Sequence, residues 1–324
     1  MNEKGAKDMF GIPDVVANTA ADLAKSDNVQ NKTASLLGML FPYAGIEKRA
    51  LDMYIADVEK SNMSSESKLI AILSAKKTIK KLKNQKSIAD KAVSSAKEGT
   101  TFDSSSGVNL EWLERFMDSA GFVSEEQVQI MWGKILAKEF EKPGSTPLNM
   151  IRILSEITPQ CAQAFQKICS MKRTSVAVDS SGKAKWIRND IVVPYEGNEG
   201  ELRSIGLSFN IFNELDTLGL IKFDAVAGFI AVDIPEMRIL TYTGGVTKEI
   251  EKRGQNELPI GNVMLTEAGE CLDRIVESEE IENFEALEKR YMEKKNIVFK
   301  EEPEYRIVNN KDGSMMLIKQ QDSK

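Results

Sequence analysis

The sequence predicts an α+β protein that is mainly α-helical, and three observations carry this prediction. Residues 1–172 repeat apolar side chains at helical spacing. Residues 173–276 instead combine short apolar and polar alternation, typical of strands, with further helical patterns. Ser, Thr, Pro and Gly stand where these segments end, as helix caps and turns require. We therefore expect four parts: a helical N-terminal region (1–100), a helical bundle (108–172), a winged-helix-like α/β module (173–276), and a helix with a β-hairpin (277–324).

The composition is that of a globular protein and argues against several kinds of chemistry. The chain has 324 residues, 42% of them hydrophobic and 28% charged, so two or three domains are expected. Its net charge of −6 means that any nucleic-acid binding must come from a local basic patch. Histidine is absent, which removes the commonest general base and metal ligand. The absence of histidine argues against Ser-His-Asp, Cys-His and zinc-peptidase centres, and no motif in the sequence indicates a cofactor.

The cysteines and the N-terminus favour a cytoplasmic location. Cys161, Cys169 and Cys271 form no Cys-x-x-Cys pair, and we interpret them as buried free thiols of a reducing compartment. The N-terminus lacks the apolar core of a signal peptide. The most apolar window, residues 33–46, contains Pro42 and is shorter than the ~20 residues that span a bilayer. We interpret it as a buried segment, and membrane attachment is not favoured.

A lysine run in the N-terminal region is the candidate contact for anions or nucleic acid. The helix expected from Glu66 onward is apolar in its front half and basic in its back half, and no aromatic residue is interleaved to stack on bases. The candidate residues are Lys76, Lys77, Lys80, Lys81, Lys83 and Lys86, with Lys91 beyond them. Three interpretations stay open: a solvated helix face, contact with phosphate or anionic lipid, and ion pairs with an acidic helix at 277–293.

The bundle at 108–172 has the clearest helix boundaries. Ser124 and Gln127 have the spacing of a capping box, so a helix is expected to begin there. The pairs Thr146-Pro147 and Thr158-Pro159 each predict a threonine cap followed by proline in the first turn. Its apolar stripes predict a rigid scaffold rather than a reaction centre. The residues expected at its core are Trp112, Trp132, Leu136 and Phe165.

The third part resembles a winged helix in the order of its elements. A helix ending at Gly219 precedes two strands, residues 228–234 and 237–245, which would pair as the wing, and Thr266 caps the next helix. The presumed groove-binding helix carries Glu214 and Asp216 and no basic residue, although phosphate contact supplies most DNA affinity. We therefore favour an interaction role, with DNA reading as the alternative.

Several motifs together resemble a known bacterial family. They are Trp112, Leu113, Arg115 and Phe116; Glu126, Trp132, Leu136 and Glu139; Pro143, Gly144 and Ser145; Ala164 and Phe165; and the segments 215–221 and 265–272. With these motifs, residues 108–276 resemble the family catalogued as domain of unknown function 2806. They are more distantly similar to the alpha-type abortive-infection proteins. The resemblance supplies no catalytic residues and implies a prophage- or island-borne protein, with phage defence as its setting.

Three hypotheses of function follow. The first is a non-enzymatic protein-interaction scaffold in phage defence, which binds a protein partner or associates with itself as a homo-oligomer. The second is a nucleic-acid-binding protein that uses residues 76–91 and the winged-helix-like module. The third is a carboxylate-dependent enzyme, such as a nuclease, which would need clustered acidic side chains in a pocket.

Overall fold

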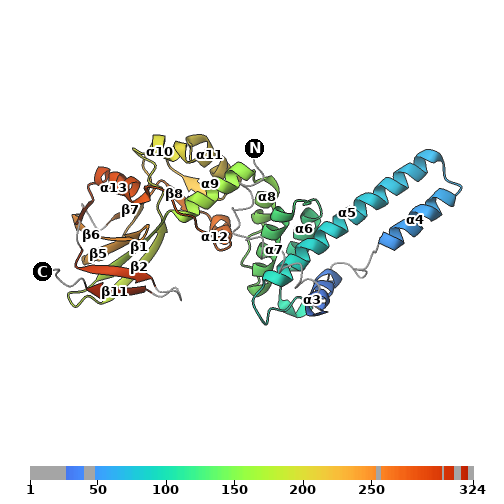
Figure 1. Cartoon of the computed structure of the whole chain (residues 1–324), viewed down its shortest axis with the longest axis horizontal. Helices are drawn as coiled ribbons and strands as arrows, with labels where there is room; N and C mark the ends of the chain where they lie inside the picture. Colours follow the sequence, from blue (N-terminus) through green and yellow to red (C-terminus); the bar gives the residue numbers. More distant parts are fainter. Residues whose placement is uncertain (1–26, 40–47, 253–256, 301–302, 310–314, 320–324) are drawn as a thin grey trace. The chain divides into compact units, whose positions relative to one another are not determined.

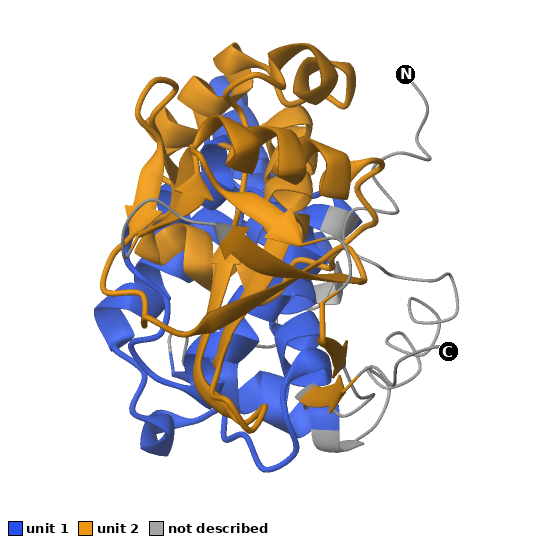
Figure 2. Ribbon diagram, turned by 90° about the vertical axis from the view of Figure 1, so that its left-hand side faces the viewer, with its two compact units in different colours: residues 1–156 blue, residues 157–324 orange. Residues whose placement is uncertain are grey.

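A computed structural model describes residues 27–39, 48–252, 257–300, 303–309 and 315–319 of the chain. The chain divides into two compact units, residues 1–156 and residues 157–324 (Figure 2). The division separates the third and fourth helices expected in one bundle, because one helix ends at Glu156 and the next begins at Pro159. The boundary expected at 172 thus lies inside the second unit. The predicted α+β class, mainly α, is confirmed.

Unit 1 is built from helices. Its elements are α3 (Asp27–Gly38), α4 (Lys48–Lys60), α5 (Ser65–Ser95), the short 3-10 helix Ser104–Ser106, α6 (Leu110–Ala120), α7 (Glu126–Glu141) and α8 (Asn149–Glu156). The longest, α5, begins at a Ser64 cap, whose side chain accepts a hydrogen bond from the Ser67 amide. Leu36 and Leu37 of the predicted apolar window are buried in α3, and residues 40–46 of that window lie outside the described residues.

The predicted capping box at Ser124 is wrong. Helix α7 is capped by Glu125, which makes no side-chain capping hydrogen bond. The Ser124 hydroxyl instead accepts a hydrogen bond from Asn84 Nδ2 of α5 at 3.2 Å. A tertiary contact has therefore replaced the local one. The cap predicted at Thr158 is confirmed, with its side chain accepting from the Cys161 amide and Pro159 in the first turn.

An antiparallel five-stranded sheet, in the order β2-β1-β5-β6-β9, forms the centre of unit 2. Its strands are β1 (Lys172–Val178), β2 (Ala184–Ile191), β5 (Arg238–Thr243), β6 (Val246–Lys252) and β9 (Val298–Lys300). Gly244 and Gly245, both at positive φ, join β5 to β6 in a tight turn. Helix α13 (Phe284–Lys294) contributes Tyr291 and Met292 to the apolar cluster on one face of the sheet.

The C-terminal hairpin predicted from the sequence is confirmed as β10 (Tyr305–Asn309) paired with β11 (Met315–Lys319). It covers the opposite face of the sheet rather than extending an edge. Tyr305 and Ile307 of β10 pack with Val176 and Leu240 of the sheet. The hairpin therefore completes the second apolar cluster of unit 2, which is why two strands that would be marginal alone are ordered here.

The winged-helix-like order is present, but its predicted wing is wrong. Helix α9 (Pro159–Ser170), α10 (Glu199–Ser204) and α11 (Phe209–Leu218) precede β3 (Ile221–Phe223), which pairs with β8 (Val263–Leu265) before α12 (Glu267–Asp273). The two strands expected to form a hairpin wing do not pair with each other. Instead β4 (Phe229–Ala231) pairs with β7 (Leu258–Gly261), and β5 enters the five-stranded sheet. Long-range pairing has therefore overridden the local hairpin.

Candidate interaction surface on helices α4 and α5

The arm, which we define as α4 and the N-terminal half of α5 (residues 48–80), carries a cluster of exposed apolar side chains. Figure 1 shows α4 beside this half of α5, whereas α6 and α7 lie beside the other half. The largest exposures on α5 are those of Leu69 (59%), Ile70 (68%) and Leu73 (56%). The remaining exposed apolar residues of the arm are Met53, Tyr54 and Met63. We call Leu69, Ile70 and Leu73 the apolar end.

Helix geometry places the apolar end and part of the lysine run on one face. At about 3.6 residues per turn, positions three and four apart lie above one another. Leu69 is followed at such intervals by Leu73, Lys76 and Lys80, and it is preceded by Glu66. All five side chains are exposed. The outward face of α5 therefore runs from an acidic residue through apolar ones to basic ones.

The seven lysines divide into two groups. In the first, Lys81 binds Asp118 of α6 at 3.2 Å, with its ammonium 4.1 Å from the Phe122 ring centre. Two further lysines of this group also have acidic partners, in the pairs Lys86–Asp90 and Lys91–Glu126. The second group comprises Lys76, Lys77, Lys80 and Lys83, which are exposed and have no ion pair within the part of the chain that the structure describes.

Two glutamates of the acidic helix, which was one predicted partner of these lysines, form ion pairs within unit 2. Within unit 2, Glu285 of α13 pairs with Lys248 at 3.1 Å. Glu288 pairs with Arg173 at 3.4 Å, and both side chains of this pair are fully buried. Ion pairing between the lysines of the arm and the acidic helix stays a prediction, because these two pairs concern only Glu285 and Glu288.

The second half of α5 is fixed to a buried aromatic cluster. Trp112 stacks on Phe116, with ring centres 4.9 Å apart, and Phe116 contacts Trp132 at 4.8 Å. Trp132 and Leu136 are fully buried, and Trp112 is nearly so. A side chain at Gly133 would come within 2.7 Å of Lys91 Cβ, so α7 approaches α5 closely at this glycine. This packing gives the arm a rigid base. Phe165, the fourth expected core residue, is buried in unit 2.

Glu139 has a structural role that sequence reasoning did not assign. Its carboxylate is buried and accepts hydrogen bonds from the Gly144 amide at 2.6 Å and from the Thr146 amide at 2.9 Å. It therefore holds the turn Pro143-Gly144-Ser145 against the end of α7. In the sequence, only the position of this glutamate shortly before a Pro-Gly turn indicated such a role.

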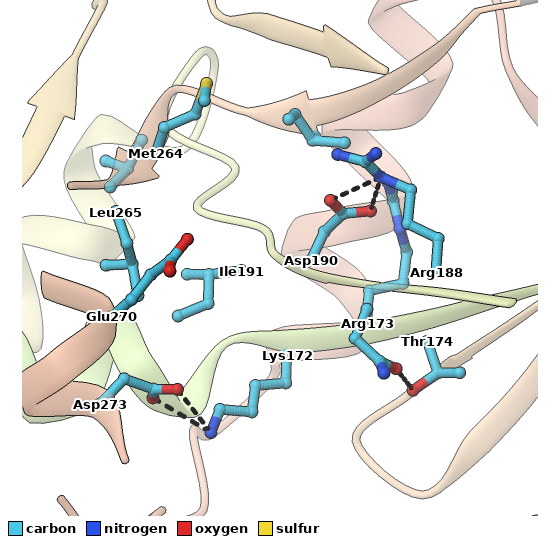
Figure 3. Close-up of a pocket in the computed structure, with 13 residues that line it drawn as sticks. Lys172, Arg173, Thr174, Arg188, Asp190, Ile191, Met264, Leu265, Glu270 and Asp273 are labelled. Carbon is cyan, nitrogen blue, oxygen red and sulfur yellow. Dashed lines mark hydrogen bonds and ion pairs between the residues drawn. The ribbon is translucent and has the colours of Figure 1, made fainter. Parts of the chain in front are cut away.

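Unit 2 contains a crevice with a volume of about 520 Å³, lined by charged and apolar side chains. It lies between the end of β2, strand β8 and helix α12 (Figure 3). Its charges largely neutralise one another: Lys172 pairs with Asp273 at 3.1 Å, and Arg188 with Asp190 at 2.8 Å. Across the described ranges, no three Cys, Asp or Glu side chains converge as a metal site would require. The carboxylate-dependent enzyme hypothesis gains no site here.

Three further observations bear on the sequence predictions. The exposed side chains of α11 are Phe209, Asn210, Asn213, Glu214 and Thr217, so this helix offers no cation to a phosphate backbone. Cys161, Cys169 and Cys271 are buried and form no disulfide, and burial raises the pKa of the Cys161 thiol to about 11. As far as the chain is described, none of its helices is long and apolar enough to cross a bilayer.

Comparison with known proteins gives one match. A family model described as "Protein of unknown function (DUF2806)" matches residues 73–288, about two thirds of the chain. The match includes the lysine run, the aromatic cluster, Glu139 and most of unit 2. No curated protein and no solved structure matches.

Proposed function

We propose that this chain, which belongs to the DUF2806 family, is an interaction protein that associates with itself through its arm. The observation that carries the proposal is the exposure of the apolar end on a helix whose other half is rigidly packed. Single exposed apolar residues are ordinary on protein surfaces, but a contiguous patch is typical of an interaction site. The family match over residues 73–288 includes Leu73 of the apolar end, whereas Leu69 and Ile70 precede it.

The self-association through the arm is expected to be of moderate strength. Complete burial of a leucine or isoleucine contributes about 1.5–3 kcal/mol, and these side chains are a little over half exposed. Two copies that bury three such side chains each would gain roughly 6–12 kcal/mol. Association costs roughly 4–15 kcal/mol in lost freedom. The most favourable combination of these values leaves about 8 kcal/mol, which corresponds to self-association in the micromolar range.

Sedimentation velocity between about 1 and 100 μM tests this proposal on the full chain. The double variant Leu69→Ser/Leu73→Ser should shift the association at least a hundredfold toward monomer, since a dimer loses four buried leucines. The matched control is Leu148→Ser, because Leu148 is 51% exposed in the same unit but outside the arm. A chain that is monomeric throughout, or a double variant that associates like the control, contradicts the proposal.

Polyanion binding by the free lysines is the second candidate function. It is favoured by the four ammonium groups of Lys76, Lys77, Lys80 and Lys83, which have no acidic partner among the described residues. Their replacement by glutamine should abolish binding of a labelled DNA duplex and flatten its salt dependence. Lys86→Gln is the control, since Lys86 already pairs with Asp90. Unchanged affinity in the fourfold variant contradicts this candidate.

Phage defence is the cellular setting that we propose for the scaffold. Its support is the resemblance of residues 108–276 to the alpha-type abortive-infection proteins. Plaque counts on bacteria that express the chain should fall relative to an empty vector, and Leu69→Ser/Leu73→Ser should restore them. If the chain never lowers plaque counts across a panel of phages, this setting is wrong, whatever the oligomeric state.

A further inference from the structure

We propose that two copies of the chain pair through antiparallel α5 helices. The twofold axis crosses α5 at the height of Ala71, on the face that carries Leu69 and Leu73. This inference rests on the proposed self-association and specifies its geometry. Around such an axis, residues equally distant from Ala71 along α5 face each other. Leu69 of each copy then faces Leu73 of the other, and the apolar ends cover one another.

The charges at the rim of this contact select the antiparallel orientation. Glu66 of one copy would face Lys76 of the other, and twofold symmetry makes this pair twice. Glu66 and Lys76 are exposed and have no ion pair in the described parts of unit 1. Each therefore has its charge available for a second copy.

A parallel pair in register is disfavoured by the same residues. It would place Lys76, Lys77 and Lys80 of one copy beside the same lysines of the other, and like charges at a contact oppose it. In the antiparallel pair, Lys76 instead faces Glu66, and Lys77 faces the uncharged Ser65 at the start of α5. The first lysine of each outward face thus meets an acidic residue of its neighbour instead of a like charge.

Helix α4 packs on a different side of α5 and does not cover the face that carries Leu69 and Leu73. Lys68 Nζ donates to the Glu59 carbonyl at 2.7 Å, which marks the side on which α4 packs. Lys68 is one position before Leu69 and therefore points about 100° away from it around the helix. The contact between copies can form without displacing α4.

Charge reversal and its rescue test this geometry by sedimentation of the full chain. Glu66→Lys and Lys76→Glu, made singly, should each raise the dimer dissociation constant about fivefold or more, because each converts two attractions into two repulsions. The double variant Glu66→Lys/Lys76→Glu should return to within about twofold of the natural chain, since both pairs are restored with opposite sense. Lys142→Glu, at an exposed lysine of the same unit outside the contact, should change little.

Each outcome has a definite meaning. Rescue in the double variant supports the antiparallel pair. If the double variant is as weak as the product of the single effects, the two residues do not meet and this geometry is overturned. Self-association through the apolar end still stands in that case, provided that Leu69→Ser/Leu73→Ser weakens it. If the leucine variant also has no effect, both proposals fall.

Discussion

Replacing Glu139 with alanine removes both acceptors that hold the turn between α7 and α8. The carboxylate accepts hydrogen bonds from the amides of Gly144 and Thr146, at 2.6 and 2.9 Å. Hydrogen bonds to a charged group contribute about 1.5–3 kcal/mol each, and a buried amide left unpaired adds to the loss. Gly144 is exposed, so water can replace one bond, whereas Thr146 is buried. We predict that Glu139→Ala lowers the free energy of unfolding of unit 1 by about 2–4 kcal/mol.

Tryptophan fluorescence during urea unfolding can measure this change in unit 1 alone. Trp112 and Trp132 lie in unit 1 and Trp186 lies in unit 2, so a Trp186→Phe background leaves only the unit 1 reporters. Glu139→Gln keeps one acceptor oxygen and should cost about half as much. The control Glu156→Gln removes only an exposed pair with Arg152 and should cost under about 0.5 kcal/mol. A loss below about 1 kcal/mol for Glu139→Ala would refute the assigned role.

Two further predictions concern unit 2. Arg173→Met should lower the free energy of unfolding in urea by about 3–5 kcal/mol, because it leaves Glu288 charged and buried. The double variant Arg173→Met/Glu288→Leu should lower it by less than the sum of the two single changes. If the two losses are additive, the coupling between the residues is contradicted. Burial raises the pKa of Tyr291 to about 12, above its ordinary value of 10, so the folded state favours the neutral phenol. The stability that this contributes is present below about pH 10 and is lost as pH rises toward 12, by about 1 kcal/mol between pH 9 and 11. Tyr291→Phe should lack this component, and parallel pH profiles of the two proteins would contradict it.

Local signals in the sequence predicted local structure well. Thr158 and Thr266 cap helices, and Gly219 ends α11 in the left-handed conformation, as their residue types require. The C-terminal hairpin was also predicted, because it depends on residues close together in the chain. Predictions were wrong where a residue distant in the sequence forms the hydrogen bond or strand pair instead of a neighbouring one. The Ser124 hydroxyl accepts a hydrogen bond from Asn84 instead of capping α7, and β4 pairs with β7 instead of with the next strand, β5.

The candidate surface could be predicted only in part. Periodicity places Leu69, Ile70 and Leu73 on neighbouring positions of a helix, but a stripe that faces a protein core and one that faces another molecule have the same spacing. Only the structure shows that nothing within the described part of unit 1 covers them. The lysine run was evident from the sequence, but its division into paired and free residues depends on Asp118 and Glu126, which belong to other helices.

The order of strands along the chain has a consequence for synthesis. Every helix of unit 1 precedes Ile157, whereas the sheet of unit 2 lacks its last strand until β9 has left the ribosome. Domains generally fold as units and the N-terminal one first, and long-range strand pairing is slow. Unit 1 can therefore fold while unit 2 is still being translated. If two arms pair as proposed, neighbouring nascent chains on one messenger would present finished arms to each other, and copies made from the same transcript would then assemble preferentially.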